Sequence, residues 1–213
     1  MIKENTQIGQ DCNIFQGAIL GEIPQDLKFE NEHSILTIGN NTTIREYVTI
    51  NRGTKDRCET TIGNNILMMA YVHVGHDTKV DDNVIIANSV QIGGHVEINQ
   101  NAIIGGSTPI HQFSKIGAFS IIGGGLRIVQ DIPPYIIAAG EPLKFSGINS
   151  IGLRRNNFSA EDRKTIKHAY KYIYKSGLNR SEAIKKIEHS FSNKKLVQSI
   201  ISFIKSSNRG IIS

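Results

Sequence analysis

The sequence of 213 residues lacks several features that define whole classes of protein. It has no stretch near the roughly 18 uninterrupted apolar residues of a membrane-spanning helix, and Met1 to Asn5 lack the apolar run of a secretory signal. These absences predict a cytoplasmic protein without an integral membrane segment. Its two cysteines, Cys12 and Cys58, are far apart and show no Cys-x-x-Cys spacing. We therefore expect free, buried or half-buried thiols rather than a disulfide or a metal site.

Positive charge is scarce in the first two thirds of the chain and concentrated in the last third. Residues 1–143 contain 9 Lys/Arg and 15 Asp/Glu, a net charge of −6, whereas residues 144–213 contain 15 and 4, a net charge of +11. A basic segment of this kind attracts an acidic partner, such as a nucleic acid, an anionic lipid surface or an acidic carrier protein. It is equally compatible with a solvated helical face rich in lysine.

An internal repeat of six residues dominates the sequence. Counting in sixes from Ile2 to Ile128 gives 19 aliphatic residues in 22 steps, and the exceptions are Asp26, Glu32 and Asp56. Six matches neither the 3.6-residue period of a helix nor the two-residue period of a strand. It fits a short strand plus a turn, repeated around a triangular prism, with three hexads to each coil. We therefore predict a mainly β protein, a parallel β-helix over residues 1–140, with loops at 22–34 and 55–59.

Small residues follow the aliphatic positions, and we expect them to turn the corners of the prism with positive φ. They are Gly9, Gly39, Gly63, Gly75, Gly93, Asn99, Gly105, Gly117 and Gly123.

The repeat ends after Ile128, where Asp131-Ile132-Pro133-Pro134 is expected to interrupt the hydrogen-bonded ladder. Residues 141–213 have helical periodicity, which predicts a small C-terminal helical domain. Ser159 and Ser181 are candidate N-caps of two helices, and a third apolar stripe runs from Leu196 to Ile204. These helices could cover the open end of the solenoid.

The histidines of the repeat are the residues that point to a catalytic site. His76, Gly94 and Gln112 follow one another at intervals of three hexads and should stack in one column, with Asp77 and His95 stacked in the next. A base, a carboxylate to hold it, and backbone N–H donors for an oxyanion are the parts that direct acyl transfer requires. No Gly-x-Ser-x-Gly motif occurs, so a covalent acyl-enzyme is not indicated.

Two other interpretations of the histidines stay open at this point. Imidazoles on neighbouring coils could bind zinc, although hexapeptide carbonic anhydrases carry a His-x-x-x-x-His pair and the residue five after His76 is Asp81. Alternatively, the histidines form surface hydrogen bonds on a non-catalytic solenoid. Among enzymes, an acyl-CoA-dependent N-acyltransferase of the same fold is the main alternative.

Several segments resemble the UDP-N-acetylglucosamine O-acyltransferase family, which opens lipid A synthesis in Gram-negative bacteria. They span nearly the whole chain, and the most specific are Gln25-Asp26-Leu27-Lys28 and His73-x-x-His76-Asp77. The others are Gly21 to Phe29, Ile44 to Thr54, Met69 to Asp77, Gly105-Gly106, Ile110 to Phe113, Asp131 to Tyr135 and Gly152 to Arg155.

The resemblance implies a left-handed coil, a homotrimer with sites between subunits, and transfer of a 3-hydroxyacyl chain from acyl carrier protein to the 3-position of a UDP-amino sugar. It implies no cofactor, no metal and no nucleic-acid partner. His76 would be the general base, Asp77 would orient it, and the Gly94 N–H would face the thioester oxygen. Substrate contacts would come from Gln25, Asp26, Lys28, His73, His95, His111, Gln112, Asn149 and Arg155.

The chain departs from the family pattern in three places. It starts inside what the family usually has as its second or third coil, so several N-terminal hexads are expected to be absent. Ile151 stands where some members have an acidic residue that contacts uracil, and Asn156 where many have a third basic residue. Gly124 occupies a position where a bulky side chain shortens the acyl pocket in some members. Glycine at this position favours a longer acyl chain as the substrate of this protein.

Overall fold

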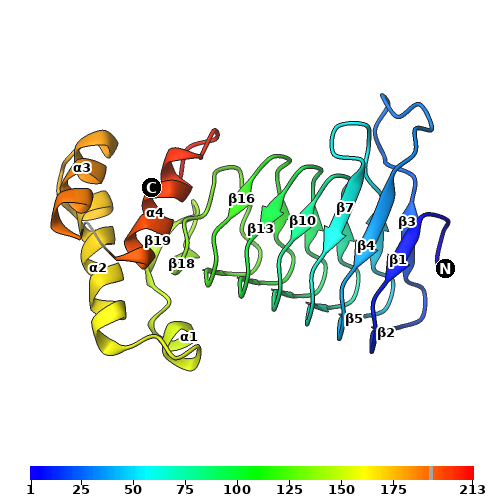
Figure 1. Ribbon diagram of the computed structural model, residues 1–213, viewed down its shortest axis with the longest axis horizontal. Coiled ribbons are helices and arrows are strands. Elements are labelled where there is room, and N and C mark those ends of the chain that lie inside the picture. Colours follow the sequence, from blue (N-terminus) through cyan, green and yellow to red (C-terminus); the bar gives the residue numbers. More distant parts are fainter. Residues whose placement is uncertain (192–193) are drawn as a thin grey trace.

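The computed structural model describes residues 1–191 and 194–213 as a left-handed parallel β-helix followed by helices (Figure 1). Each hexad supplies one short strand and one turn, and three hexads close a coil of triangular cross-section. Strand partners in the regular coils are separated by three hexads, as in the pairs Ile85 with Ile103 and Ile86 with Ile104. The fold predicted from the six-residue repeat is confirmed.

The strands form three sheets, one on each face of the prism. Face I consists of β1 (Thr6–Ile8), β4 (Ile35–Ile38), β7 (Glu59–Ile62), β10 (Lys79–Val80), β13 (Glu97–Ile98) and β16 (Lys115–Ile116). Face II consists of β2 (Asn13–Ile14), β5 (Thr43–Ile44), β8 (Leu67–Met68), β11 (Ile85–Ile86), β14 (Ile103–Ile104), β17 (Ile121–Ile122), β18 (Ile136–Ala139) and β19 (Lys144–Ile148). Face III consists of β3 (Ile19–Glu22), β6 (Thr49–Asn51), β9 (His73–Val74), β12 (Gln91–Ile92) and β15 (Pro109–Ile110).

The aliphatic column of the repeat forms the core of the prism. From Ile38 to Ile128 each aliphatic residue of the column is at most 3% exposed. In the first coil, Ile2 and Ile14 are 56% and 36% exposed. Burial of this column drives the coils together, at about 25 cal/mol for each square ångström of apolar surface removed from water.

The prediction that the glycines after the core positions have positive φ is wrong. Positive φ occurs two residues later, for example at Asp77 (58°), His95 (60°) and Phe113 (64°). The glycines are small for another reason, which is the close approach of successive coils. A Cβ on Gly75 would lie 2.8 Å from the backbone nitrogen of Gly94, a distance that no side chain tolerates.

Two loops interrupt the coils, at residues 23–34 and 52–58, and both leave the corner where face III passes into face I (Figure 1). The predicted bounds, 22–34 and 55–59, are shifted: Glu22 still belongs to β3, the second loop already begins after Asn51, and Glu59 belongs to β7. Partners across the loops, Thr6 with Leu36 and Leu36 with Thr60, are separated by five and four hexads instead of three. The loops therefore insert the length of two hexads and of one hexad, so the sequence count keeps its register through them.

The coil continues through the two prolines, contrary to the expected break in the ladder. The N–H of Ile132 donates to the Lys115 carbonyl, and the N–H of Gly117 donates to the Ile132 carbonyl. Neither bond needs a proline N–H. Next, β18 pairs with β17 in parallel and β19 returns antiparallel to β18. Because β18 and β19 share a sheet, the division into domains at residues 140 and 141 stays a prediction.

The C-terminal part contains α1 (Ser150–Arg155), α2 (Ala160–Lys175), α3 (Arg180–Ser190) and α4 (Lys195–Lys205). Ser159 caps α2 as predicted, and its partner Asp162 completes a capping box. The predicted cap of α3, Ser181, is wrong, because Asn179 accepts from the Glu182 N–H and Glu182 bonds back to the Asn179 N–H.

The helices cover the C-terminal end of the coil, as expected for a solenoid that must hide its last core layer. The hydroxyl of the buried Tyr170 on α2 donates to the Pro134 carbonyl at 2.6 Å, and α4 buries Val197, Ile200 and Ile204. Within the described residues, no helix has both the length and the apolar composition needed to cross a membrane. Both cysteines are free as predicted, although Cys58 is exposed rather than buried.

Candidate active site

The predicted histidine column exists and lies on the corner between faces III and I. His76–Asp77 joins β9 to β10, Gly94–His95 joins β12 to β13, and His111–Gln112 joins β15 to β16. The loops 52–58 and 23–34 leave the same corner, one and two coils nearer the N-terminus respectively. The coil register therefore brings the three histidine-bearing turns and both insertions together.

Asp77 holds His76 through a short hydrogen bond. The Nδ1 of His76 lies 2.7 Å from the Oδ2 of Asp77, whose side chain is fully buried, while the imidazole remains 15% exposed. Thr54 adds two more bonds to the carboxylate, from its N–H to Oδ1 at 2.9 Å and from its hydroxyl to Oδ2 at 2.7 Å. The Asp77 N–H donates to the Thr60 hydroxyl. The carboxylate is thus fixed on both oxygens.

These contacts set opposite pKa shifts on the two partners. Hydrogen bonding to Asp77 raises the pKa of His76 above its ordinary 6.5, with partial burial opposing and the charges of Asp26 and Asp56 adding to the rise. Burial alone would raise the pKa of Asp77, but the hydrogen bonds from His76 and Thr54 outweigh it and lower the pKa to about 2. Asp77 is therefore ionised at neutral pH.

Gly94 packs directly against the imidazole of His76. A Cβ on Gly94 would lie 2.7 Å from both Cε1 and Nε2 of His76, so only glycine fits without moving the ring. Within the described part of the chain, the Gly94 N–H donates no hydrogen bond, whereas its carbonyl accepts from the Phe113 N–H. A free donor beside a candidate base is what an oxyanion needs.

His95 packs beside this pair without replacing it. Its Nε2 lies 3.6 Å from Oδ2 of Asp77 and 3.8 Å from Oδ2 of Asp56. Its ring stacks on Phe113 at 4.4 Å and meets the edge of His76 at 5.1 Å. Burial lowers the pKa of His95, so His95 is the more neutral of the two imidazoles.

A cavity of about 400 Å³ opens in front of the imidazole of His76. Its lining includes four predicted site residues besides His76, namely Gln25, His73, Gly94 and Gln112. The Nδ1 of His73 is 2.8 Å from the Thr49 hydroxyl, and burial lowers the pKa of His73. The lining also includes residues that the sequence prediction missed, among them Asn51, which donates to the Ile23 carbonyl and fastens the 23–34 loop.

Other predicted residues lie at the rim or elsewhere. His111 contacts the Gln112 carbonyl at the edge of the corner. Asp26 accepts from the backbone N–H of Lys28, and Lys28 is itself exposed.

Gly124, Asn149 and Arg155 are not part of this cavity. Gly124 lies over Gly106 on the corner between faces II and III. Asn149 caps α1 and donates to the Phe119 carbonyl. Arg155 ends α1. The substrate contacts predicted for these three residues stay predictions.

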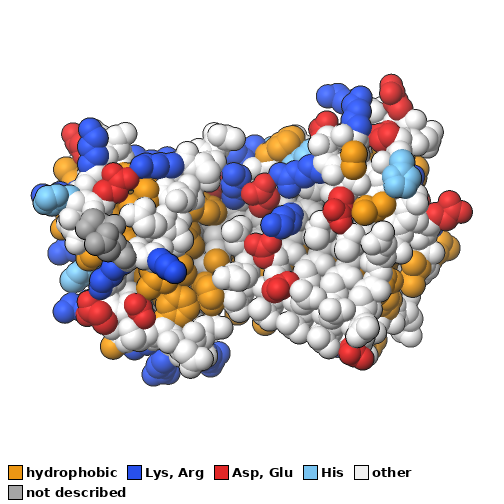
Figure 2. Space-filling model, viewed as in Figure 1, with side chains coloured by type: hydrophobic (Ala, Val, Ile, Leu, Met, Phe, Trp, Pro, Cys, Tyr) orange, Lys and Arg blue, Asp and Glu red, His pale blue; other side chains and the backbone are white. Residues whose placement is uncertain are grey.

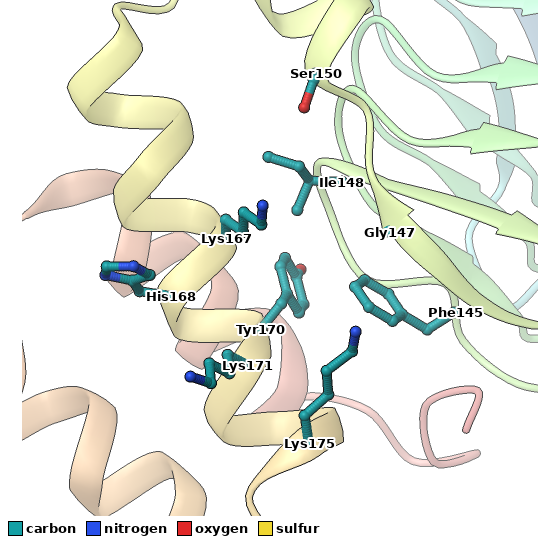
Figure 3. Close-up of a pocket in the computed structure, with 9 residues that line it drawn as sticks. All are labelled: Phe145, Gly147, Ile148, Ser150, Lys167, His168, Tyr170, Lys171 and Lys175. Carbon is teal, nitrogen blue, oxygen red and sulfur yellow. The ribbon is translucent and has the colours of Figure 1, made fainter.

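A second cavity, of about 540 Å³, lies between β19 and α2, outside the histidine corner (Figure 3). Phe145 and Ile148 face it from β19 and Tyr170 from α2, and Lys167 and Lys175 extend toward that apolar floor. Lys171 and His168 complete the rim on the outer side of the helix. Lys and Arg side chains are frequent over this helical end (Figure 2). This cavity has cationic walls, and its lining contains no base-carboxylate pair. It is therefore better suited to binding an anionic partner than to catalysis.

The candidate ligand atoms at the histidine corner are close enough together for a metal site. One ligand atom each from His76, Asp77 and His95 lie within 4.8 Å of one another. However, the Nδ1 of His76 is directed at Asp77, and both carboxylate oxygens already accept from Thr54. A metal would have to displace these bonds, so the donor set fits a general base better than a zinc centre.

The 52–58 loop is a further part of the site that sequence reasoning missed. Besides Thr54, its Arg57 donates to the Asp77 carbonyl and to Glu97 across the corner. These residues belong to an insertion, so they occupy no column of the repeat. The sequence did contain one indication that the loop lies near the site. The insertion follows a face III strand, and His76–Asp77 follows a face III strand one coil later, so both leave the same corner.

Comparison with known proteins assigns the family. Residues 131–212 match the family model described as UDP-N-acetylglucosamine O-acyltransferase, domain 2. The acyl-[acyl-carrier-protein]--UDP-N-acetylglucosamine O-acyltransferase of Aquifex aeolicus is 58% identical over 199 residues, which are 93% of this chain and 76% of that protein. The protein of the same name from Sulfurihydrogenibium is 54% identical, over 94% of this chain and 74% of its own length.

Solved structures agree with the sequence comparison. The UDP-N-acetylglucosamine acyltransferase LpxA of Bacteroides fragilis superposes with a TM-score of 0.97 at 48% identity, covering all of this chain and 83% of that one. The corresponding enzyme of Moraxella catarrhalis gives 0.95 at 41% identity, covering 99% and 82%. With the fold shared and the sequences this similar over most of both chains, this chain belongs to the UDP-N-acetylglucosamine O-acyltransferase family.

Proposed function

We propose that the chain transfers a 3-hydroxyacyl group from acyl carrier protein to the 3-position of UDP-N-acetylglucosamine or its 3-amino analogue, the first step of lipid A synthesis. One observation carries the proposal: an imidazole anchored by a buried carboxylate presents its other edge to the backbone of Gly94. The names of the relatives supply the two substrates.

In the proposed reaction His76 is the general base. Its Nε2 takes the proton from the 3-hydroxyl as that oxygen bonds to the thioester carbonyl carbon, and the carbonyl electrons move onto the oxygen. The Gly94 N–H donates to this oxyanion. When the intermediate collapses, the C–S bond breaks and His76 returns the proton to the departing thiolate. A positioned base contributes about 10²–10⁴ in rate and an oxyanion donor about 10²–10³.

Asp77 selects the reactive form of His76. A carboxylate next to Nδ1 favours the tautomer that carries its proton there, which leaves the Nε2 lone pair free for the acceptor. During proton transfer the same carboxylate stabilises the imidazolium. Because the pKa of Asp77 is about 2, it stays ionised throughout the range in which His76 titrates.

The remaining predicted residues are proposed as substrate contacts. The sugar and acyl groups would be contacted by Gln25, Asp26, His73, His95, His111 and Gln112. The nucleotide or the pantetheine arm would be contacted by Lys28, Asn149 and Arg155, with Gly124 at the end of the acyl pocket.

A neighbouring copy is needed if the distant residues belong to the same site. Gly124 and Arg155 lie away from the cavity beside His76, so we propose a homotrimer with sites between subunits. Co-expression of His76→Ala with Arg155→Ala tests this. If subunits share sites, mixed trimers regain part of the activity that each variant lacks alone. A mixture as inactive as the single variants would argue against shared sites.

The basic C-terminal part supports an acidic acyl donor. Lys167, Lys171 and Lys175 follow one another at helical spacing around the cavity on α2. Changing all three to glutamate should raise the KM for acyl carrier protein at least about tenfold, because like charges repel, while a small acyl-pantetheine thioester is used as before. The matched control is Lys185→Glu with Lys186→Glu on α3, which should leave this KM unchanged.

His76→Ala tests the catalytic role itself. This variant should lose transfer by at least about 10²-fold and keep the melting temperature of the parent, since the imidazole is at the surface of the coil rather than in its core. Thioester consumption with both sugar acceptors gives the rate. Full activity of the His76→Ala variant would refute the proposed mechanism.

A further inference from the structure

Thr54 contacts both oxygens of the Asp77 carboxylate. Its N–H donates to Oδ1 at 2.9 Å and its hydroxyl to Oδ2 at 2.7 Å, and Thr54 is only 5% exposed. The loop that carries it is held in place independently, because Arg57 bonds to the Asp77 carbonyl and to Glu97. Thr54 is therefore a fixed, buried donor pair and not a chance surface contact.

The Oδ2 atom of Asp77 accepts from two sides. The Thr54 hydroxyl and the His76 Nδ1 both lie 2.7 Å from it. The hydroxyl limits where the carboxylate can rotate, and it also withdraws part of the negative charge that His76 experiences. In the described chain, the hydrogen-bond donors to this carboxylate are Thr54 and His76, with the Nε2 of His95 further away at 3.6 Å.

We propose that Thr54 is a positioning residue for acyl transfer, and that it orients His76 by clamping Asp77. The inference rests on the proposed function, in which His76 is the base. It assigns a purpose to the 52–58 insertion: one extra hexad of chain places a hydroxyl and an N–H over the carboxylate, where a regular coil has only a short turn.

Other charged groups face the same corner and form the electrostatic environment of His76. His95 approaches Asp77 from the β12–β13 corner, Asp56 and Arg57 from the 52–58 loop, and Asp26 from the 23–34 loop. None of these side chains is itself replaced in Thr54→Val, and the one other bond lost with the hydroxyl is the 3.3 Å bond that it accepts from the Asp56 N–H. The shape of the side chain and the backbone N–H are also retained, so the variant removes one hydroxyl.

The test is the pH profile of Thr54→Val. Hydrogen bonds to charged groups contribute enough that kcat should fall about 10- to 100-fold, with the KM for the UDP-sugar unchanged. The acid limb of kcat/KM should move to higher pH. Without the hydroxyl, the full negative charge of the Asp77 carboxylate acts on His76 and raises the pKa of His76. Thr54→Ser should restore both. A purely structural role would lower the melting temperature and leave the acid limb in place.

Two controls make the result decisive. Thr42→Val removes another buried hydroxyl, which donates to the Gly63 carbonyl on the corner between faces I and II, and it should leave kcat and the acid limb unchanged. The pKa of His76, followed by NMR in each protein, needs no activity. A wild-type chain without transferase activity would refute the proposed function, whereas an unchanged His76 pKa in Thr54→Val would refute the role of Thr54.

Discussion

Replacing Gly94 by alanine separates the two catalytic roles assigned to the histidine corner. The new Cβ would lie 2.7 Å from Cε1 and Nε2 of His76, whereas carbon atoms in contact prefer about 3.5–4.0 Å. The φ of Gly94 is not positive, so alanine does not strain the backbone there. The backbone N–H, the proposed oxyanion donor, is kept. Among the protein groups nearest to the new Cβ, the change therefore acts on the imidazole.

The ring must move by roughly 1 Å to relieve this contact. It cannot do so freely, because its Nδ1 is bonded to Asp77 at 2.7 Å and its edge packs against His95. A displacement of that size can cost about 10²-fold in rate, so we expect kcat for acyl transfer to fall by about that factor.

A thioester-consumption assay measures the loss, with a thermal melt to verify folding. Gly123→Ala is the matched control, since its nearest contact is the flexible Leu126 side chain at 3.0 Å on another corner. It should retain the parent rate. If Gly94→Ala stays within twofold of the parent, the ring is not held as described.

Further predictions concern pH, metal, the core and a helix cap. Because Asp77 raises the pKa of His76 and the base must be neutral, the acid limb of kcat/KM should lie above the ordinary histidine pKa of 6.5 and activity should fall below it; a limb on the acid side of that value would contradict this. Prolonged dialysis against EDTA should leave the rate unchanged, and a loss restored by zinc would support a metal centre instead. Ile98→Ala should cost about 2–5 kcal/mol of unfolding free energy in urea, since Ile98 is 1% exposed. Asn179→Ala should cost about 1 kcal/mol through its lost cap, and no change in the melt would argue against the capping box.

The sequence was sufficient for the architecture because the repeat is a simple physical rule. A core residue every six positions fixes both the prism and the stacking of His76 over Gly94, and the structure bears out each. The count even survived the insertions, since each adds a whole number of hexads and so preserves the period. The family resemblance rested on motifs along nearly the whole chain, and the comparisons agree with it.

What could not be predicted depends on contacts outside the repeat. Thr54 is brought to Asp77 by a loop that has no column, so the spacing pointed only to the corner that the loop leaves and not to the contact with Asp77. The small residues after the core positions were assigned to the wrong cause, because a close approach of backbones and a positive φ both select glycine. In this chain, residues such as Asp77 and His95 adopt the positive φ instead, and the ladder bonds on either side hold them there.

The central claim is that His76 drives acyl transfer to a UDP-amino sugar. The most direct measurement is a product analysis by mass spectrometry, with UDP-N-acetylglucosamine and its 3-amino analogue each incubated with a series of 3-hydroxyacyl carrier proteins. The account predicts a 3-acylated UDP-sugar from the parent chain and none from His76→Ala. Absence of product with every carrier and acceptor, or equal product from both proteins, would contradict it.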